Sequence, residues 1–259
     1  MRYYSSYKVL LFPILICPFI SYGQVVHVQA HSHNDYFQAR PLLDALDNRF
    51  NEVEADIYDT PAGLVVSHER PGADTRLLEQ LYFRPIDSLI QTQGSVQKDS
   101  KSPFMLMLDF KSSAARTYQS LLRLLKQYPR LACTSASCPV IIFISGNRPL
   151  ELILQDPSGA LKIDGRPEDL GKGHSSMLMP VISDRFQNWC SWNGKGHPST
   201  DDGEKIRSLA NKAHQEGKKL RLWSIPDHEE AWAFLIDCGV DLINTDHLAE
   251  LNRYLQSRK

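Results

Sequence analysis

The sequence lacks several features that would set it apart from an ordinary globular protein. Its 29 Lys and Arg are balanced by 30 Asp and Glu and form no basic block, so the electrostatic footprint of a nucleic-acid binder is missing. With 14 Gly and 15 Pro in 259 residues, neither a collagen-like repeat nor a long disordered tail is expected. The composition, 42% hydrophobic and 23% charged, predicts a globular chain with no nucleic-acid partner.

Long apolar runs are also missing. The run Val9–Ile20 has 12 residues and includes two prolines, whereas a membrane-spanning helix needs roughly 20 apolar residues. Two basic residues precede this run and small residues follow it at Ser21–Gly23, which is the pattern of a secretory signal. We therefore expect residues 1–23 to be a cleaved signal peptide and residues 24–259 to form a secreted or periplasmic domain without a membrane span.

Cysteine is scarce, with five residues and no Cys-x-x-Cys pair, which argues against a zinc or dithiol redox site. Because an exported chain meets an oxidising compartment, Cys133 and Cys138 are candidates for a disulfide within one loop. Cys190 and Cys238 are expected to be buried, unreactive thiols.

Short apolar runs alternate with helical patterns along the chain, as repeated units of a strand and a crossover helix would. Apolar residues recur at helical spacing in Asp202–Glu216 and Ala114–Gln127, for example. Eight strands in a chain of this length predict a single α/β domain with a TIM-type (β/α)8 barrel. A doubly wound open sheet is the alternative, but it would need a glycine-rich turn after the first strand, where His31–Asp35 stands instead. The predicted strands are Val25–Ala30, Glu52–Ile57, Leu64–Ser67, Phe104–Phe110, Val140–Ser145, Leu161–Asp164, Leu220–Ile225 and Val240–Asn244.

The second predicted strand has acidic residues on one side. Because side chains of a strand alternate, Glu52, Glu54 and Asp56 share the face that would line a barrel lumen. Buried carboxylates repel one another unless a cation lies between them, so Glu54 and Asp56 are candidate metal ligands. Oxygen ligands favour Mg²⁺ or Ca²⁺. From this segment alone, the alternative is an exposed edge strand with a solvated acidic face.

Two further predicted strands end in residues that suit catalysis. His68 follows Leu64–Ser67, and Lys111 follows Phe104–Phe110, at the strand ends where barrel enzymes place their reactive groups. Asp109 is a candidate third metal ligand. Lys111 is expected either to pair with Asp109 or to face an anionic substrate.

Directly after the first predicted strand, His31 and His33 lie on the side opposite to Ser32 and Asn34. Two separated imidazoles beside a carboxylate-bound cation suit the hydrolysis of a phosphodiester. One histidine removes the proton of the attacking hydroxyl, the other protonates the leaving oxygen, and the cation offsets charge on the nonbridging oxygens.

Six short motifs follow one another through almost all of the mature chain: Ala30–Tyr36 (AHSHNDY), Glu54-x-Asp56, Leu64–Glu69, Leu108–Lys111, Leu220–Ile225 and Gly239–Asp246. In their order and spacing they resemble successive barrel strands of the glycerophosphodiester phosphodiesterase and phosphatidylinositol phospholipase C-like superfamily. The resemblance implies a metal-dependent phosphoric diester hydrolase with one divalent cation, Mg²⁺ or Ca²⁺. Its expected partner is a small-molecule or lipid phosphodiester, such as a glycerophosphodiester or a related phospholipid headgroup.

The resemblance also implies roles for individual residues. The cation would be held by the two acids of Glu-x-Asp and by the acid of the fourth strand, and two histidines would act as base and acid. The implied residues are Glu54, Asp56 and Asp109 for the cation, His33 and His68 for catalysis, and Lys111, Trp223 and Asn34 for the substrate.

The sequence departs from the family pattern in two places. Enzymes of the glycerophosphodiester type usually have His-Arg-Gly after the first strand, and this chain has neither that Arg nor that Gly. Their fourth-strand ligand is commonly Glu, where this chain has Asp109. Because of these departures, the sequence does not assign the residues that contact the substrate phosphate. It also leaves two candidates, His31 and His33, for the first catalytic histidine. We favour His33, because its distance to the helix-opening Pro41 suits the family pattern better.

Two other functions stay open from the sequence. The pair His31-x-His33 is similar to the start of amidohydrolase-type and polymerase-histidinol-phosphatase-type sites, in which imidazoles hold several metals. Such sites need further ligands at later strand ends, and only Asp246 would fit. The third hypothesis is a secreted barrel that binds a polar headgroup without hydrolysing it.

Overall fold

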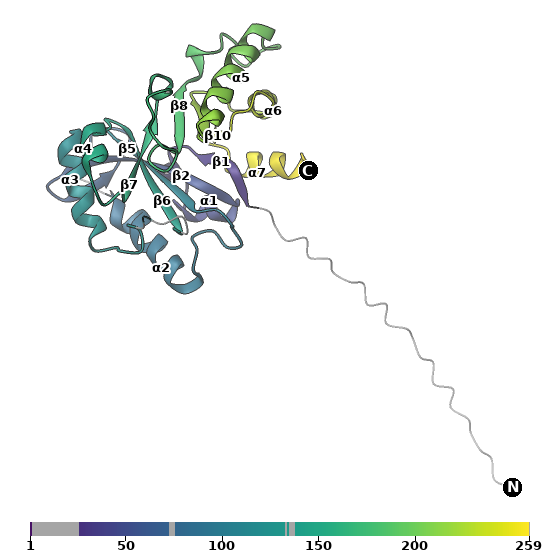
Figure 1. Ribbon diagram of the computed structural model, residues 1–259. Coiled ribbons are helices and arrows are strands. Elements are labelled where there is room, and N and C mark those ends of the chain that lie inside the picture. Colours follow the sequence, from purple (N-terminus) through teal and green to yellow (C-terminus); the bar gives the residue numbers. More distant parts are fainter. Residues whose placement is uncertain (2–25, 73–75, 133, 135–137, 259) are drawn as a thin grey trace.

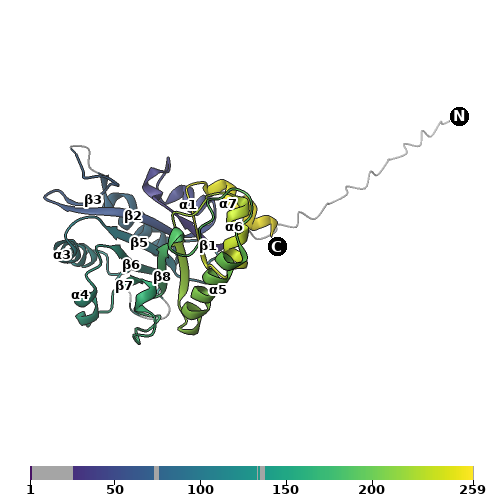
Figure 2. The same ribbon diagram turned by 90° about the horizontal axis from the view of Figure 1, so that it is seen from above.

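Parallel strands with outward-facing helices form a closed barrel in this computed structural model, which describes residues 1, 26–72, 76–132, 134 and 138–258 (Figures 1 and 2). The ring runs β1, β2, β5, β6, β7, β8, β9, β10, and β10 pairs with β1 to close it. The predicted eight-stranded TIM-type barrel is thereby confirmed. Its strands are β1 (His27–Ser32), β2 (Phe50–Thr60), β5 (Phe104–Phe110), β6 (Val140–Gly146), β7 (Leu161–Gly165), β8 (Val181–Arg185), β9 (Lys219–Trp223) and β10 (Leu242–Thr245).

Helices cover the outside of the ring. In α5, the residues Ile206, Leu209, Ala210 and Ala213 are buried at the spacing that the sequence predicted, because this stripe packs toward the strands. The hydroxyl of Ser199 accepts from the Asp202 amide and caps the start of this helix. The helices are α1 (Leu43–Asp47), α2 (Arg84–Gln93), α3 (Ala114–Leu125), α4 (Leu150–Gln155), α5 (Thr200–Gln215), α6 (Glu229–Asp237) and α7 (Leu248–Ser257), with shorter helical segments η1 (Asp35–Phe37), η2 (Glu79–Phe83), η3 (Pro167–Asp169) and η4 (Phe186–Asn188).

Both faces of the barrel strands are buried, but the two faces carry different kinds of residue. Outward side chains such as Leu106 and Leu108 belong to the large core beneath the helices. Inward side chains form a separate apolar cluster that fills part of the lumen and consists of Met105, Met107, Phe143, Val181 and Leu242. The register pairs Met107 with Glu54 and Asp109 with Asp56, so the acids lie toward the carboxyl ends of β2 and β5.

One predicted barrel strand is wrong. Leu64–Ser67 does form a strand, β3 (Gly63–Val66), but β3 pairs antiparallel with the end of β2 and carries β4 (Arg76–Leu77) on its other edge. The short turn at Pro61–Ala62 explains this, because a parallel pairing needs a crossover of a dozen residues or more. The hairpin extends away from the ring (Figure 2). The eighth barrel strand is β8, which the sequence analysis missed because it contains only two aliphatic residues.

Three further predictions concern the ends and the cysteines of the chain. Apart from Met1, the predicted signal peptide of residues 1–23 lies outside the described residues, as does Cys133 of the predicted disulfide. Cys190 and Cys238 are buried and free, as predicted. Among the helices that the structure describes, none has the length and hydropathy to span a membrane.

Candidate active site

Three carboxylates meet inside the mouth of the barrel. Glu54 and Asp56 lie on β2 and Asp109 lies on β5, and the parallel register places Asp56 directly beside Asp109. One oxygen atom from each carboxylate lies within 4.8 Å of the other two. Glu54 and Asp56 are buried, and Asp109 is half-buried. The period of two along neighbouring parallel strands therefore brings the three predicted ligands together on the lumen side.

The oxygen atoms of this acidic cluster fit a divalent cation. The Lys111 ammonium nitrogen lies 3.2 Å from Asp56 Oδ2 and 3.3 Å from Asp109 Oδ2. The Oδ1 atoms of both aspartates are buried and have no hydrogen-bond partner among the described residues. Buried polar atoms are nearly always satisfied, and carboxylate oxygens are the ligands that Mg²⁺ and Ca²⁺ prefer.

Mutual repulsion makes the cluster electrostatically unfavourable by itself. Burial and the charge of Glu54 raise the pKa of Asp109 to about 6, and the same two causes raise the pKa of Asp56. Burial also acts to raise the pKa of Glu54, but the hydrogen bond with His31 and the charge of Arg221 lower it to about 2. A cation among these groups would favour their ionised forms.

His68 reaches the acidic cluster from the β2–β3 hairpin. Because β3 runs back along β2, the Ser67 amide donates to the Asp56 carbonyl at 3.1 Å, at the level of the acids. The Nδ1 atom of His68 lies 2.9 Å from Asp56 Oδ2, and the Tyr36 hydroxyl donates to the same oxygen at 2.9 Å. The antiparallel return, and not the end of a barrel strand, thus brings His68 to the mouth. Its side chain stays 49% exposed.

His33 follows β1 and lies at the seam where the ring closes. Its Nδ1 atom is 2.8 Å from Asp246 Oδ1, which follows β10, and its side chain is 34% exposed. Burial lowers the pKa of His33, but the hydrogen bond with Asp246 and the charge of Glu54 more than compensate and raise it above its ordinary value. His33 therefore has one ring nitrogen held by a carboxylate and lies within the field of the acidic cluster.

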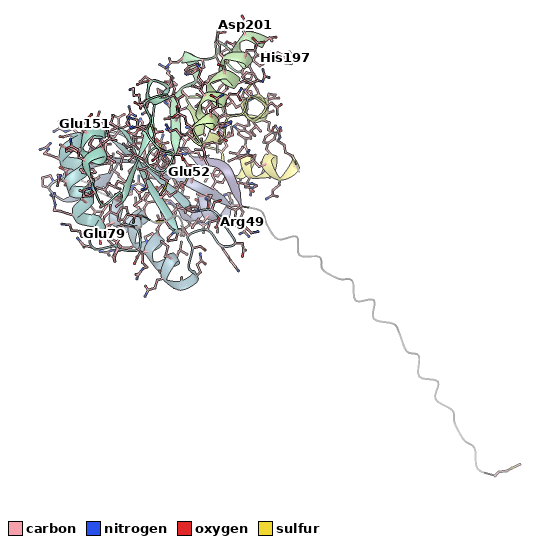
Figure 3. All side chains as sticks on the ribbon, viewed as in Figure 1. Arg49, Glu52, Glu79, Glu151, His197 and Asp201 are labelled. Atoms are coloured by element: carbon pink, nitrogen blue, oxygen red, sulfur yellow. The ribbon has the colours of Figure 1, made fainter. Side chains whose placement is uncertain are left out.

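His31 occupies a different environment from His33, although both point into the lumen. The His31 side chain is fully buried, with Nδ1 at 2.7 Å from Glu52 Oε1 and Nε2 at 2.9 Å from Glu54 Oε2. An Arg221 nitrogen also lies 3.1 Å from His31 Nε2. Figure 3 shows Glu52 among the strands, in contrast to the labelled residues at the periphery. Both ring nitrogens of His31 are therefore engaged inside the barrel.

The two remaining predicted substrate residues also lie near carboxyl ends of strands. Asn34 has a left-handed backbone with φ 46°, and its amide nitrogen lies 3.3 Å from His33 Nε2. Trp223 ends β9 and is half-buried, with the Arg185 guanidinium 5.9 Å from its ring centroid. Asn34 thus contacts a predicted catalytic histidine, whereas the contact recorded for Trp223 is with Arg185.

The sequence analysis did not predict the contacts of several residues of the site. Tyr36 and Arg221 lie inside motifs that were noted, but their hydrogen bonds to Asp56 and His31 depend on distant strands. Asp246 was expected mainly as a helix cap, and it pairs with His33 across 213 residues. Arg221 had a usable signal, because it lies between Leu220 and Leu222, which face the outer core, and must therefore point inward.

Gly146 at the end of β6 supports Asp109. Its φ is +66°, and a Cβ atom there would lie 2.0 Å from Asp109 Oδ1 and 2.7 Å from the Phe110 carbonyl oxygen. Real side chains do not approach this closely, so the absence of a side chain makes room for the Asp109 carboxylate. A glycine that directly follows a buried strand is the sequence signal for such a contact.

The alternative of a site with several imidazole-bound metals finds no support in the described residues. Within them, the group of possible ligands that comes together consists of the three carboxylates and contains no histidine. His31 and His33 instead pair with separate carboxylates.

Solved structures of known enzymes have the same fold. A crystal structure of a glycerophosphodiester phosphodiesterase from Parabacteroides distasonis matches with a TM-score of 0.57 at 15% identity, covering 89% of this chain and 97% of that one. A second, from Agrobacterium tumefaciens, matches with a TM-score of 0.50 at 13% identity, covering 88% and 99%. At these identities the likeness establishes the barrel fold alone.

Sequence comparison identifies the family. The protein named altered inheritance of mitochondria protein 6 in Eremothecium gossypii is 28% identical over 274 residues, covering 88% of this chain and 70% of that protein. Its counterpart in Kluyveromyces lactis is 25% identical over 298 residues, covering 86% and 71%. The family model of the AIM6-like phosphodiesterase domain matches residues 21–158, which is more than half of the chain and includes the three carboxylates, His33, His68 and Lys111. The chain belongs to the family of AIM6-like phosphodiesterase domains.

Proposed function

We propose that this chain hydrolyses phosphodiesters of the glycerophosphodiester type with one divalent cation, Mg²⁺ or Ca²⁺, held by Glu54, Asp56 and Asp109. The observation that carries the proposal is the pair of buried, unpartnered Oδ1 atoms of Asp56 and Asp109 beside Glu54. The bound cation would offset negative charge on the nonbridging phosphate oxygens.

His33 is the proposed general base. Its Nδ1 faces Asp246, which accepts the Nδ1 proton, so Nε2 is the nitrogen that would take a proton from the attacking hydroxyl, in place of its contact with the Asn34 amide at 3.3 Å. In a glycerophosphodiester, the hydroxyl next to the phosphorylated carbon is the proposed nucleophile. Its oxygen forms a bond to phosphorus, the bond from phosphorus to the headgroup oxygen breaks, and the product is a cyclic phosphate that water opens afterwards.

His68 is the proposed general acid. Asp56 accepts from its Nδ1 and stabilises the imidazolium, so the Nε2 proton can pass to the headgroup oxygen as it leaves. The exposure of His68 suits a group that must meet the leaving alcohol. Lys111 is proposed to pair with a phosphate oxygen, and Trp223 and Asn34 are proposed to border the substrate.

The environments of the two first-strand histidines support His33 over His31 as the base. A general base needs a ring nitrogen that can meet the substrate proton. Both nitrogens of His31 are engaged with buried carboxylates, whereas His33 is partly exposed and has one nitrogen turned away from Asp246. We infer that His31 holds Glu54 in position.

The proposed setting is extracytoplasmic. The basic residues, short apolar run and small residues of the first 23 residues support an export signal, and we propose that residues 24–259 form the secreted or periplasmic domain.

Turnover of soluble diesters tests the proposed function. The purified chain is incubated with glycerophosphocholine or glycerophosphoinositol, with Mg²⁺, Ca²⁺ or EDTA, and released headgroup is measured. We expect cation-dependent release, and a fall in kcat of about 10²- to 10⁴-fold for His33→Ala and for His68→Ala. His197→Ala, at the periphery in Figure 3, is the control and should leave kcat unchanged. Cation binding without turnover of any diester would favour a headgroup-binding protein instead.

A further inference from the structure

A second cavity opens at the end of the barrel opposite to the carboxylates. Its volume is about 360 Å³, which is in the range of small-ligand sites. It is lined by residues that begin barrel strands, among them Met105 of β5, Ile141 of β6, Lys162 of β7 and Lys219 of β9. Ligand-sized space thus exists at the amino ends of the strands, apart from the proposed catalytic residues.

The cavity contains two ammonium groups that have no carboxylate partner among the described residues. Lys162 Nζ donates to the Gly159 carbonyl, and Lys219 Nζ lies 3.8 Å from the sulfur of Met105. Both side chains are half-buried, and no ion pair joins either of them to an acid in the part of the chain that the structure describes. Burial lowers the pKa of Lys162, because no negative charge compensates for its lost hydration.

The neighbouring Lys218, in contrast, has an acidic partner. Its side chain is fully buried, and its ammonium nitrogen pairs with Glu216 Oε2. Lys219 follows directly in the sequence, faces the cavity and has a thioether as its recorded contact. Burial of an ammonium group is unfavourable unless an anion or other acceptors compensate for it. The unpaired lysines therefore point to an anion that arrives from outside.

The rest of the lining is apolar. Met105, Ile141, Met177 and Pro180 contribute carbon and sulfur surface to the cavity, and Met177 is 63% exposed in a chain that otherwise exposes few large apolar side chains. Methionine side chains adapt to ligands of irregular shape. The cavity therefore offers cationic groups and a flexible apolar surface together.

We propose that this cavity binds a small amphipathic anion, with its carboxylate or phosphate between Lys162 and Lys219 and its short apolar chain against Met105, Ile141 and Met177. The proposal does not depend on the proposed catalytic function. Met107 and Phe143 of the apolar lumen cluster follow Met105 and Ile141 toward the carboxyl ends of β5 and β6, so they separate the site from the mouth.

Titration calorimetry of the full chain tests the proposal with four probes: octanoate, octyl phosphate, inorganic phosphate and octanol. We expect saturable binding of one equivalent of octanoate or of octyl phosphate, with inorganic phosphate and octanol at least tenfold weaker. The amphiphile that binds with the higher affinity shows whether the cavity prefers a carboxylate or a phosphate. Saturable binding of neither amphiphile, or binding of octanol as strong as that of octanoate, overturns the proposal.

Substitution of the lysines assigns the binding to this cavity. Lys162→Met with Lys219→Met should weaken binding of the amphiphile about 100-fold, since each of the two charged hydrogen bonds contributes about one order of magnitude. Without ligand, the same variant should have a higher melting temperature, which also shows that it folds. Lys212→Met, on the exposed side of α5, is the control and should change neither value. An unchanged affinity of the double variant contradicts the proposal. Lys219→Met alone serves if the double variant does not fold, and it should weaken binding about tenfold.

Discussion

The two ends of the barrel lumen present the same physical situation with opposite sign. At the carboxyl ends of the strands, Asp56 and Asp109 have buried oxygen atoms to which none of the described residues donates. At the amino ends, Lys162 and Lys219 have half-buried ammonium groups with no acid beside them in the described ranges. An apolar cluster of lumen residues lies between them. We therefore expect each end to be stabilised by a ligand of opposite charge.

The difference between the ends lies in how tightly the groups are held. Three described groups, Lys111, His68 and Tyr36, contact Asp56 Oδ2 and fix this carboxylate. Within the described part of the chain, the Lys219 ammonium contacts a thioether sulfur and has a flexible stem. A rigid set of oxygens suits a small hard cation, whereas mobile ammonium groups suit a larger anion whose position is less constrained.

The largest effect is expected at the acidic end. Asp109→Asn should abolish the cation-induced rise in melting temperature and lower the hydrolysis of glycerophosphocholine by about 10³-fold or more, because it removes a charged ligand from the proposed cation site. The melting temperature is measured with and without Mg²⁺ or Ca²⁺. Glu151→Gln on α4, at the periphery in Figure 3, is the matched control. A variant that still gains stability from the cation would remove Asp109 from the ligand set.

The second-largest effect on activity is expected where β1 and β10 pair. Asp246→Asn should lower kcat by about 10²-fold, because the Asn amide NH2 can donate to Nδ1 of His33 and so favour the wrong tautomer, with the proton on Nε2. Cation affinity should stay the same, since Asp246 lies outside the carboxylate cluster. Steady-state kinetics and a cation titration check the two halves of this prediction. A parallel loss of cation affinity would mean that Asp246 acts on the acids.

A smaller effect is expected at Gly146. Gly146→Ala should weaken cation affinity and lower activity about tenfold, because its Cβ would displace the Asp109 carboxylate. The matched control is Gly94→Ala, which also has a positive φ, +78°, but has nothing within 4 Å of the added atom. Gly94→Ala should cost about 1 kcal/mol of unfolding free energy and leave the cation titration unchanged. Equal behaviour of the two variants would show that strain, and not the contact with Asp109, is responsible.

The smallest effect is a pH dependence at the amino end. Because the pKa of Lys162 is lower in the folded chain than its ordinary value, the unfolded chain binds more protons between these two pKa values. The contribution of Lys162 to the free energy of unfolding should therefore rise with pH in this alkaline range, by less than about 1 kcal/mol since the group is partly solvated. Urea unfolding of the wild type and of Lys162→Met, from pH 8 upward, measures the difference. A wild type that shows no additional rise would contradict the unpaired state of Lys162.

The barrel was predictable because its signals are local. The apolar run Phe104–Phe110 and the helical periodicity in Asp202–Glu216 each depend on one segment, and the structure reproduces both closely. The prediction of Leu64–Ser67 as a barrel strand was wrong because an apolar run does not encode pairing direction, which the short turn at Pro61–Ala62 determines. The strand β8 was missed because too few of its residues are aliphatic.

The candidate site was predictable where one strand supplies several groups. Glu54 and Asp56 share a side by alternation, and the parallel register then adds Asp109. The sequence could not separate the environments of His31 and His33, because a spacing of two predicts the same side for both at the end of the first strand. Their difference comes from Glu52, Arg221 and Asp246, which reach them from neighbouring strands.

The contact between His33 and Asp246 joins residues near the two ends of the described chain. His68 and Asp56 are only 12 residues apart and can meet once a single hairpin has formed. His33 and Asp246, 213 residues apart, can meet only when the last strand has docked against the first. The proposed cation ligands and acid can thus assemble early, whereas the base is oriented by the final step of closure. A barrel with a detached last strand would hold its cation and stay inactive, so the enzyme would not act before its folding is complete.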